Sequence, residues 1–274
     1  YTYLVRYSFL AAVAFFAHKS CMEPLLMSML SAKSICFEYS GKIIFDNASI
    51  HVSEGSITGL LGPNGSGKTT FFDIICGLRK AKNGILLNNF SNQLYLSQTV
   101  LTPPALRMFD VFKMTTLLCS SSHISQEQAL KKLSTWSPEI VERYKEIWTK
   151  KSSVCSYGEK RWFFTLSLLA VEADLVILDE PTAGVDPEFR HYIWKCLRGA
   201  ASEGAAILVS SHSIEEVANN CGNFYMISQQ KFKPFDSGKE FMHCYGSNTL
   251  DEAFIRAAAA PPPASRFPIV QQLD

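Results

Sequence analysis

The stretch from Gly62 to Thr69, which reads Gly-Pro-Asn-Gly-Ser-Gly-Lys-Thr, constrains this chain more than any other. It matches the pattern G-x-x-x-x-G-K-[ST], in which a strand leads into a glycine-rich loop and then a helix. The apolar run from Ile57 to Leu61 precedes it, and a helix-like segment follows. The glycines let the backbone curl so that several N–H groups face an anion, which the helix N-terminus also attracts. The stretch therefore predicts a phosphate-binding loop in an α/β fold.

Individual residues of this loop have distinct expected roles. Lys68 is expected to reach the β- and γ-phosphates of a nucleotide, and the hydroxyl of Thr69 to bind Mg²⁺. A glycine-rich turn with a surface lysine is the alternative, but the flanking strand and helix both match the phosphate loop. The predicted nucleotide-binding set around the loop is Gly62, Pro63, Asn64, Gly65, Ser66, Gly67, Lys68, Thr69 and Thr70.

Two adjacent carboxylates follow a second apolar run. Leu175 to Leu178 has the form of a buried parallel strand, and Asp179 and Glu180 come directly after it. Adjacent acids can simply end a strand. Behind a phosphate loop, one carboxylate can hold Mg²⁺ while the next orients or deprotonates the attacking water.

Two more polar residues come after predicted strands. Gln98 follows Leu94 to Leu96, and His212 follows the run from Ala206 to Val209 with only two serines between. Ligands of open α/β sheets bind at the carboxyl ends of the strands, so these side chains are expected to share one edge with Asp179. The predicted catalytic set is Lys68, Gln98, Glu180 and His212, and the predicted metal-binding set is Thr69, Gln98 and Asp179.

The segments around this core differ in pattern. Short β-rich runs at Ile35–Tyr39, Ile43–Phe45 and Ser49–Val52 predict a small antiparallel sheet before the core. Between about residues 103 and 154, Tyr144, Ile147 and Trp148 recur at helical spacing, which predicts a helical insertion. Ser156 and Gly158 then open a further helix, where unsatisfied N–H groups form a second anion site.

Composition excludes some classes of partner. Lys and Arg number 26 against 25 Asp and Glu, so nothing marks the chain as a general binder of nucleic acid. The 8 cysteines are spread singly and are interpreted as buried thiols in a reducing compartment.

Both ends of the chain are expected to lie outside the domain. Leu4 to Ala17 is almost wholly apolar, yet it is shorter than the roughly 20 residues that a membrane span needs. It is interpreted as the end of a truncated membrane helix, a targeting remnant or a helix packed on a partner; a buried or disordered extension is the fourth possibility. Ala257 to Ala264, with three prolines, predicts a linker or tail that continues to residue 274.

Taken together, these motifs resemble the ATP-binding cassette, or nucleotide-binding domain, of ABC transporters. The resemblance covers about residues 32 to 256, with residues 1–31 as an extension and 257–274 as a linker or tail. The parts that resemble family motifs are Tyr39 as the adenine-stacking aromatic, Gly62–Thr69 as Walker A, Gln98 as the Q-loop, Cys155–Glu159 as the signature, Asp179 and Glu180 as Walker B, Ala183–Asp186 as the D-loop and His212 as the switch histidine.

The resemblance implies a fold and a set of ligands. The fold is α/β: a P-loop NTPase core with a mainly parallel sheet, an N-terminal antiparallel β-subdomain and a helical subdomain at about residues 99–170. The ligands are ATP and Mg²⁺, with Tyr39, Ser156, Gly158 and Asp186 added to the nucleotide-binding set. A packing role is the alternative for Tyr39, because a lone tyrosine more often packs against its neighbours than binds a ligand.

The resemblance also implies partners. Two cassettes of this family pair head to tail, as a homodimer or a pseudo-dimer, so Ser156 and Gly158 would close the ATP site of the second cassette. An isolated chain would hydrolyse ATP poorly. A transmembrane permease subunit, or a fused membrane domain, is the other partner. This places the chain peripherally on the cytoplasmic or organelle-matrix face of a membrane, with no direct nucleic-acid contact. Cys155, Tyr157 and Glu159 depart from the usual Leu-Ser-Gly-Gly-Gln signature.

The expected function is that of a transport motor. The stretches 182–187 and 249–255 look most like those of cassettes that export a drug, lipid or polysaccharide. An importer cassette of the branched-chain amino-acid type is one alternative, because its signature is similar. A soluble ABC ATPase that acts on ribosomes or nucleic acid is another. A catalytically silent subunit is disfavoured by the intact Lys68, Asp179, Glu180 and His212.

Overall fold

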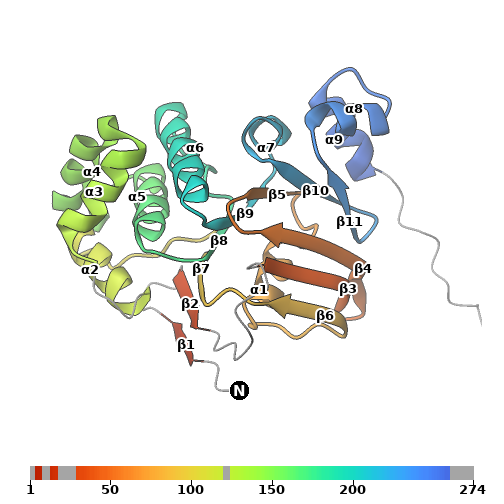
Figure 1. The fold of residues 1–274 in the computed structure, drawn as a ribbon, viewed down its shortest axis with the longest axis horizontal. Helices are drawn as coiled ribbons and strands as arrows, with labels where there is room; N and C mark the ends of the chain where they lie inside the picture. Colours follow the sequence, from red (N-terminus) through yellow and green to blue (C-terminus); the bar gives the residue numbers. More distant parts are fainter. Residues whose placement is uncertain (1–3, 8–12, 18–28, 120–123, 260–274) are drawn as a thin grey trace, which may run out of the picture.

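The computed structural model describes residues 4–7, 13–17, 29–119 and 124–259. Within these residues, eight strands form one sheet in the order β1-β2-β7-β8-β9-β5-β10-β11, and three form a second sheet in the order β4-β3-β6 (Figure 1). The strands are β1 (Leu4–Tyr7), β2 (Val13–Ala17), β3 (Met29–Tyr39), β4 (Lys42–Ser53), β5 (Ile57–Leu61), β6 (Asn83–Asn88), β7 (Asn92–Leu96), β8 (Leu175–Asp179), β9 (Ala206–Ser211), β10 (Asn223–Ser228) and β11 (Lys231–Phe235).

The centre of the large sheet is parallel. β7 pairs with β8, β8 with β9, β9 with β5 and β5 with β10, all in parallel. Every residue of β5, β8 and β9 is buried, which is why their sequences are apolar runs and not alternating patterns. The register places Asp179 beside Ser210 and Leu61 beside Ser211, so the carboxyl ends of these strands meet at one edge.

Four of the helices gather on the side of the molecule that lies away from the small sheet (Figure 1). Figure 1 shows α2, α3, α4 and α5 gathered at one side of the molecule, away from β3, β4 and β6. The helices are α1 (Lys68–Ile75), α2 (Met108–Cys119), α3 (Gln126–Trp136), α4 (Val141–Thr149), α5 (Tyr157–Ala170), α6 (Pro187–Ser202), α7 (Ile214–Asn220), α8 (Gly238–Cys244) and α9 (Leu250–Ala259), with 3-10 turns η1 (Pro138–Ile140) and η2 (Ser152–Val154).

Aromatic packing joins the helical insertion to the core. The ring of Tyr144 stacks on Phe163 with centroids 4.7 Å apart, and Trp162 stacks on Phe189 of α6 at 4.6 Å. Tyr144, Phe163 and Trp162 are all 0% exposed. The predicted buried face of the insertion is therefore confirmed, and the bulky residues of α5 are part of it.

The small sheet differs from its prediction in two respects. Ile43–Phe45 and Ser49–Val52, expected as separate strands, both lie in β4, and β3 begins at Met29, ahead of the expected domain start at residue 32. The reason is local backbone irregularity: Ser34 and Asn47 have positive φ angles of 54° and 59°, and the β3–β4 register shifts near them. Such bulges interrupt the alternating pattern that marks a continuous strand.

The helical interpretations of the N-terminal segment are wrong. Residues 4–7 and 13–17 form the antiparallel pair β1 and β2, and β2 pairs antiparallel with β7. A short apolar run does not distinguish a strand from a helix, and the free edge of β7 decided the outcome. None of the helices in the described ranges is long and apolar enough to cross a membrane.

The C-terminal prediction is partly corrected. The structure continues α9 through Ala259, so residues 257–259, expected to begin a linker, still belong to a helix. The Ala and Pro residues from 260 onward lie outside the described residues, as do residues 18–28. The domain boundaries at 32 and 256 stay predictions.

Candidate active site

The loop between β5 and α1 has the backbone geometry that a phosphate cradle needs. Gly65 and Gly67 have φ angles of 78° and 106°, in the left-handed region that favours glycine. A Cβ atom on Gly67 would lie 2.7 Å from a methyl group of Ile44 and 2.8 Å from the ring of Phe45. α1 begins at Lys68 immediately afterwards, so the N–H groups of its first turn are available to an anion.

Lys68 lies inside this loop. Its ammonium donates a hydrogen bond to the carbonyl of Gly62 at 2.8 Å and lies 3.4 Å from Oε1 of Glu180. Both side chains of this pair are less than a tenth exposed. The buried positive charge is thus balanced by the carboxylate of Glu180, the residue directly after β8.

Asp179, at the end of β8, accepts a hydrogen bond on each carboxylate oxygen. The Thr69 hydroxyl donates to Oδ2 at 2.5 Å, and the Ser210 hydroxyl donates to Oδ1 at 2.5 Å. Asp179 is 1% exposed, and this burial raises the pKa of its carboxyl group. A hydroxyl and a carboxylate side by side form the hard-oxygen donor set that Mg²⁺ prefers, so these residues fit the predicted ion.

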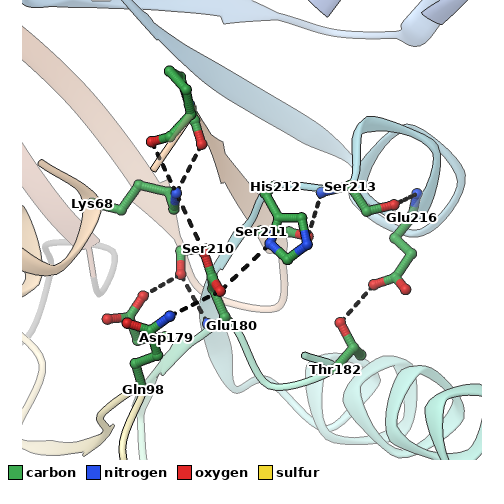
Figure 2. Close-up of polar contacts among 12 residues, drawn as sticks. Lys68, Gln98, Asp179, Glu180, Thr182, Ser210, Ser211, His212, Ser213 and Glu216 are labelled. Carbon is green, nitrogen blue, oxygen red and sulfur yellow. Dashed lines mark hydrogen bonds and ion pairs between the residues drawn. The ribbon is translucent and has the colours of Figure 1, made fainter. Parts of the chain in front are cut away.

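Three side chains converge on Glu180 (Figure 2). Lys68 approaches one carboxylate oxygen, while Nε2 of Gln98 donates to the other at 3.1 Å and Nδ1 of His212 lies 3.5 Å from it. Glu180 also has a positive φ of 52°, an unusual backbone for a non-glycine residue, and its N–H donates to Ser210 at 2.9 Å. Strained backbone of this kind is frequent where a side chain is held for function.

The predicted second anion site lies at the start of α5. Ser156 is the N-cap residue and forms a reciprocal capping box with Glu159. Burial raises the pKa of Glu159, but hydrogen bonds from Lys150 and from the Ser156 N–H outweigh it, so the net pKa is lowered. A Cβ atom on Gly158 would lie 2.8 Å from the carbonyl of Gly184, which brings the start of α5 against the predicted D-loop.

The structure thus divides the predicted site residues into two groups. The first group is one connected network of hydrogen bonds and ion pairs. Lys68, Gln98 and His212 contact Glu180, which Ser210 links to Asp179 and so to Thr69. In the described part of the chain, no such bond joins Ser156 or Gly158 to the phosphate loop. Ser156 caps its own helix, and Gly158 lies against Gly184 and Val185.

Two other predicted residues lie at the surface. Tyr39, at the end of β3, is 58% exposed, and the guanidinium of Arg79 lies over its ring at 5.6 Å. Asp186 is the exposed N-cap residue of α6. Both positions leave their side chains accessible to a ligand or partner, and their roles stay predictions.

Sequence reasoning missed Arg161. This residue is 0% exposed and donates to the carbonyls of Ser97 at 2.5 Å and Gln98 at 3.0 Å, and also to that of Asp179. Burial lowers the pKa of its guanidinium. The sequence signal was weak, because Arg161 follows Glu159 and Lys160 and so reads as part of a polar first turn of α5.

A second missed group connects the turn after Glu180 to α7. Thr182 donates to Glu216 at 2.6 Å, and Arg190 of α6 forms an ion pair with the same carboxylate at 3.0 Å. Glu216 lies in the first turn of α7 (Ile214–Asn220), the helix that follows His212 (Figure 2). The turn that follows Glu180, α6 and α7 are therefore joined by one partly buried acceptor.

These parts together suit phosphoryl transfer to water. The edge of the sheet provides an amide cradle, an ammonium group, an oxygen pair for a divalent cation and a buried carboxylate held by an amide and an imidazole. These parts come from the ends of four neighbouring strands, β7, β8, β9 and β5, so the sheet order assembles the site.

Comparisons with known proteins agree with this chemistry. A family model described as "ABC transporter" matches residues 45–183. The chain is 29% identical over 239 residues to Protein McbF of Escherichia coli, covering 85% of this chain and 96% of McbF. It is 29% identical over 218 residues to the lipopolysaccharide export system ATP-binding protein LptB of Escherichia coli K12, covering 74% of this chain and 88% of LptB.

A solved ATP-binding subunit of an ABC transporter has a similar fold. The TM-score is 0.72 at 20% identity, and the alignment covers 84% of this chain and 99% of that one. At this level of identity the likeness concerns the fold alone. The predicted fold class, an α/β core with an antiparallel sheet and a helical insertion, is confirmed.

Proposed function

The chain belongs to the ABC transporter family and is an ATP-binding ATPase, and we propose that it powers export through a membrane partner. In the proposal it lies peripherally on the cytoplasmic or organelle-matrix face of a membrane, bound to a permease subunit or a fused membrane domain. The cargo would be a drug, a lipid or a polysaccharide. Cassettes of this family work with membrane permeases and as dimers.

The convergence on Glu180 is the observation that carries the catalytic part of the proposal. Glu180 would take a proton from the attacking water, since it is buried and its carboxylate is oriented by Gln98 and His212. Lys68, now 3.4 Å from Glu180, would turn to the phosphates when ATP binds. Glu180 would then be free to act as a base.

Thr69 and Asp179 are the residues proposed to hold Mg²⁺, with the amide of Gln98 as a further ligand. Ser210 fixes the second oxygen of Asp179, which orients the carboxylate toward Thr69. When bound, the ion neutralises charge on the β- and γ-phosphates. The hydroxyl of Thr69 and the carboxylate of Asp179 would be the oxygen ligands that this chain offers to the ion.

The proposed ATP site is completed by a second cassette. Ser156 and Gly158 lie apart from the phosphate loop of their own chain, which supports their assignment to the γ-phosphate of a partner copy. Tyr39 is proposed to stack on the adenine with its free face, and Asp186 to take part in the contact between cassettes. Closure of the pair would exclude water and complete the electrostatic stabilisation of the transferred phosphate.

Export is supported by the printed role of one relative. LptB is named as the ATP-binding protein of a lipopolysaccharide export system, and this chain matches 88% of its length. The direction of transport can be tested in the source cell with the Lys68→Ala variant. An exporter that loses its motor leaves its cargo inside the cell, whereas an importer that loses its motor leaves it outside.

The Glu180→Gln variant tests the catalytic proposal. It keeps the shape of the side chain but removes the base, so ATP should bind and not be hydrolysed. We expect a dimer in sedimentation velocity with ATP and Mg²⁺, a monomer without ATP, and a hydrolysis rate at least about a hundredfold below that of the native chain. A Glu54→Gln variant, changed at an exposed residue between β4 and β5, is the control. A Glu180→Gln chain that stays monomeric and hydrolyses ATP normally would contradict the mechanism.

A further inference from the structure

The main-chain carbonyl of Gln98 is held by two side chains of α5. The hydroxyl of Tyr157 donates to it at 3.0 Å, and Nη1 of Arg161 donates to it at 3.0 Å. A carbonyl oxygen has two lone pairs, so this acceptor is fully occupied. The loop after β7 is therefore fixed by the helix that carries the predicted signature.

Arg161 extends this contact to the neighbouring strand. Among the described residues, its hydrogen bonds go only to backbone carbonyls: Ser97 and Gln98 after β7, and Asp179 at the end of β8. A buried guanidinium needs such acceptors, because an unpaired buried charge is very costly. Arg161 thus ties together the two strand ends from which Gln98 and Glu180 emerge.

Tyr157 is held in place differently. It is 47% exposed, so core packing does not fix its hydroxyl. Its ring lies against Gly184, since a Cβ atom on that glycine would be 3.2 Å from the ring. One tyrosine thus contacts both the loop of Gln98 and the turn that follows Glu180.

The side chain of Gln98 completes the connection. The main-chain carbonyl of Gln98 is held by α5, and the side-chain Nε2 of the same residue donates to Glu180 at 3.1 Å. A shift of the backbone would move the amide with it, and misplacement by about 1 Å can cost a hundredfold in rate. The position of the Gln98 backbone therefore sets where one of the three groups that contact the carboxylate of Glu180 lies.

We infer that Tyr157, together with Arg161, is a positioning residue for hydrolysis: it fixes the backbone of Gln98 so that the Gln98 amide orients Glu180. The inference rests on the proposed roles of Gln98 and Glu180. It assigns Tyr157 a task within its own chain, besides any contact that the start of α5 makes with a second cassette. Tyr157 is the suitable residue to test, because it is half-exposed and its hydroxyl can be removed alone.

The experiment compares ATP hydrolysis by the native chain, Tyr157→Phe, Gln98→Ala and the double variant. Tyr157→Phe keeps the ring on Gly184 and loses one hydrogen bond, so we expect kcat to fall about threefold to tenfold. The KM for ATP and the Tm should stay unchanged, since the nucleotide contacts and the core are intact. Tyr192→Phe, at a partly buried tyrosine on α6, is the matched control and should change nothing.

The double variant decides whether Tyr157 acts through Gln98. If it does, the phenylalanine change has no further effect once Gln98 is alanine. If the two losses in kcat multiplied in the double variant, the inference would be overturned. It would also be overturned if Gln98→Ala were impaired while Tyr157→Phe kept the native kcat. Normal hydrolysis by Gln98→Ala would instead refute the proposed role of Gln98 itself, and the inference with it.

A dimer assay separates the effect from the contact between cassettes. In the Glu180→Gln background, Tyr157→Phe should still give the ATP-dependent dimer in sedimentation velocity, because the hydroxyl is directed at Gln98 of its own chain. Loss of that dimer would mean that the phenol acts at the partner, and the inference would fail.

Discussion

Oγ1 of Thr69 lies 2.5 Å from Oδ2 of Asp179, although 110 positions separate the two residues in the sequence. β9 alone lies between β8 and β5 in the sheet, so the end of one strand faces the loop that follows the other. Ser210 of β9 donates to the second oxygen of the same carboxylate. The buried carboxylate is therefore held by hydroxyl groups on both sides.

Asp179→Asn is expected to stabilise the nucleotide-free chain at neutral pH and to inactivate it. Burial raises the pKa of Asp179 above its ordinary value of 3.8, so the folded chain binds this proton more tightly than the unfolded chain. The protonated Asp179 carboxyl therefore stabilises the fold fully at a pH below its ordinary pKa of 3.8, and this stabilisation is lost as the pH rises through the raised pKa of the folded chain. At pH 7 the asparagine removes a buried charge, so we expect a Tm a few degrees higher and hydrolysis at least about a hundredfold lower.

Thermal unfolding between pH 4 and pH 8, roughly spanning the range in which buried carboxyl groups titrate, checks this prediction. The gap in Tm between Asp179→Asn and the native chain should narrow as the pH falls. Asp46→Asn, at an exposed position on β4, is the control and should show no such gap. A Tm below that of the native chain at every pH would show that the carboxylate stabilises the fold.

Lys68→Ala is expected to weaken ATP binding by about tenfold or more. A charge-assisted hydrogen bond contributes roughly 1.5–3 kcal/mol, and this ammonium is directed into the phosphate loop. Titration of each chain with a fluorescent ATP analogue measures the effect. Lys80→Ala, at an exposed lysine after α1, is the matched control. Native affinity in Lys68→Ala would refute the assignment of this loop.

Gly158→Ala is expected to impair hydrolysis without unfolding the chain. The new methyl group would lie 2.8 Å from the carbonyl of Gly184, so the turn after Glu180 must shift. Overpacking of this kind costs about 1–3 kcal/mol, and we expect a Tm lower by a few degrees and hydrolysis reduced about tenfold. Gly222→Ala, where the nearest atom is 4.0 Å away, should behave as the native chain. Equal activity in the two variants would show that this close approach has no role.

Glu216→Ala is expected to destabilise the chain by about 1–2 kcal/mol. The change leaves the hydroxyl of Thr182 and the guanidinium of Arg190 without their shared acceptor, and solvent reduces the loss at the partly exposed arginine. Urea unfolding measures the free energy. Glu215→Ala, its exposed neighbour in the first turn of α7, provides the control. Matching midpoints for the two variants would contradict the structural role of Glu216.

Local patterns were sufficient where a short segment specifies its own conformation. The glycines at 65 and 67 allow the left-handed backbone of the loop, and the apolar runs of β8 and β9 follow from burial on both faces. Local patterns were insufficient where pairing between distant segments decided the secondary structure. Residues 13–17 became a strand because β7 offered an edge, and the bulges near Ser34 and Asn47 concealed the continuity of β3 and β4.

The sequence by itself determined which chemical groups this protein has for its proposed reaction: a glycine-rich loop that ends in Lys-Thr, an acidic pair after a strand, and the amide and imidazole that follow two other strands. Only the tertiary structure decided how they meet. The order β7-β8-β9-β5 brings Gln98, Glu180 and His212 together, and α5 packs so that Tyr157 and Arg161 hold the carbonyl of Gln98. The physical reason is that a motif specifies its own backbone and side chains, whereas these contacts join segments far apart in the chain and depend on the whole sheet and its helices.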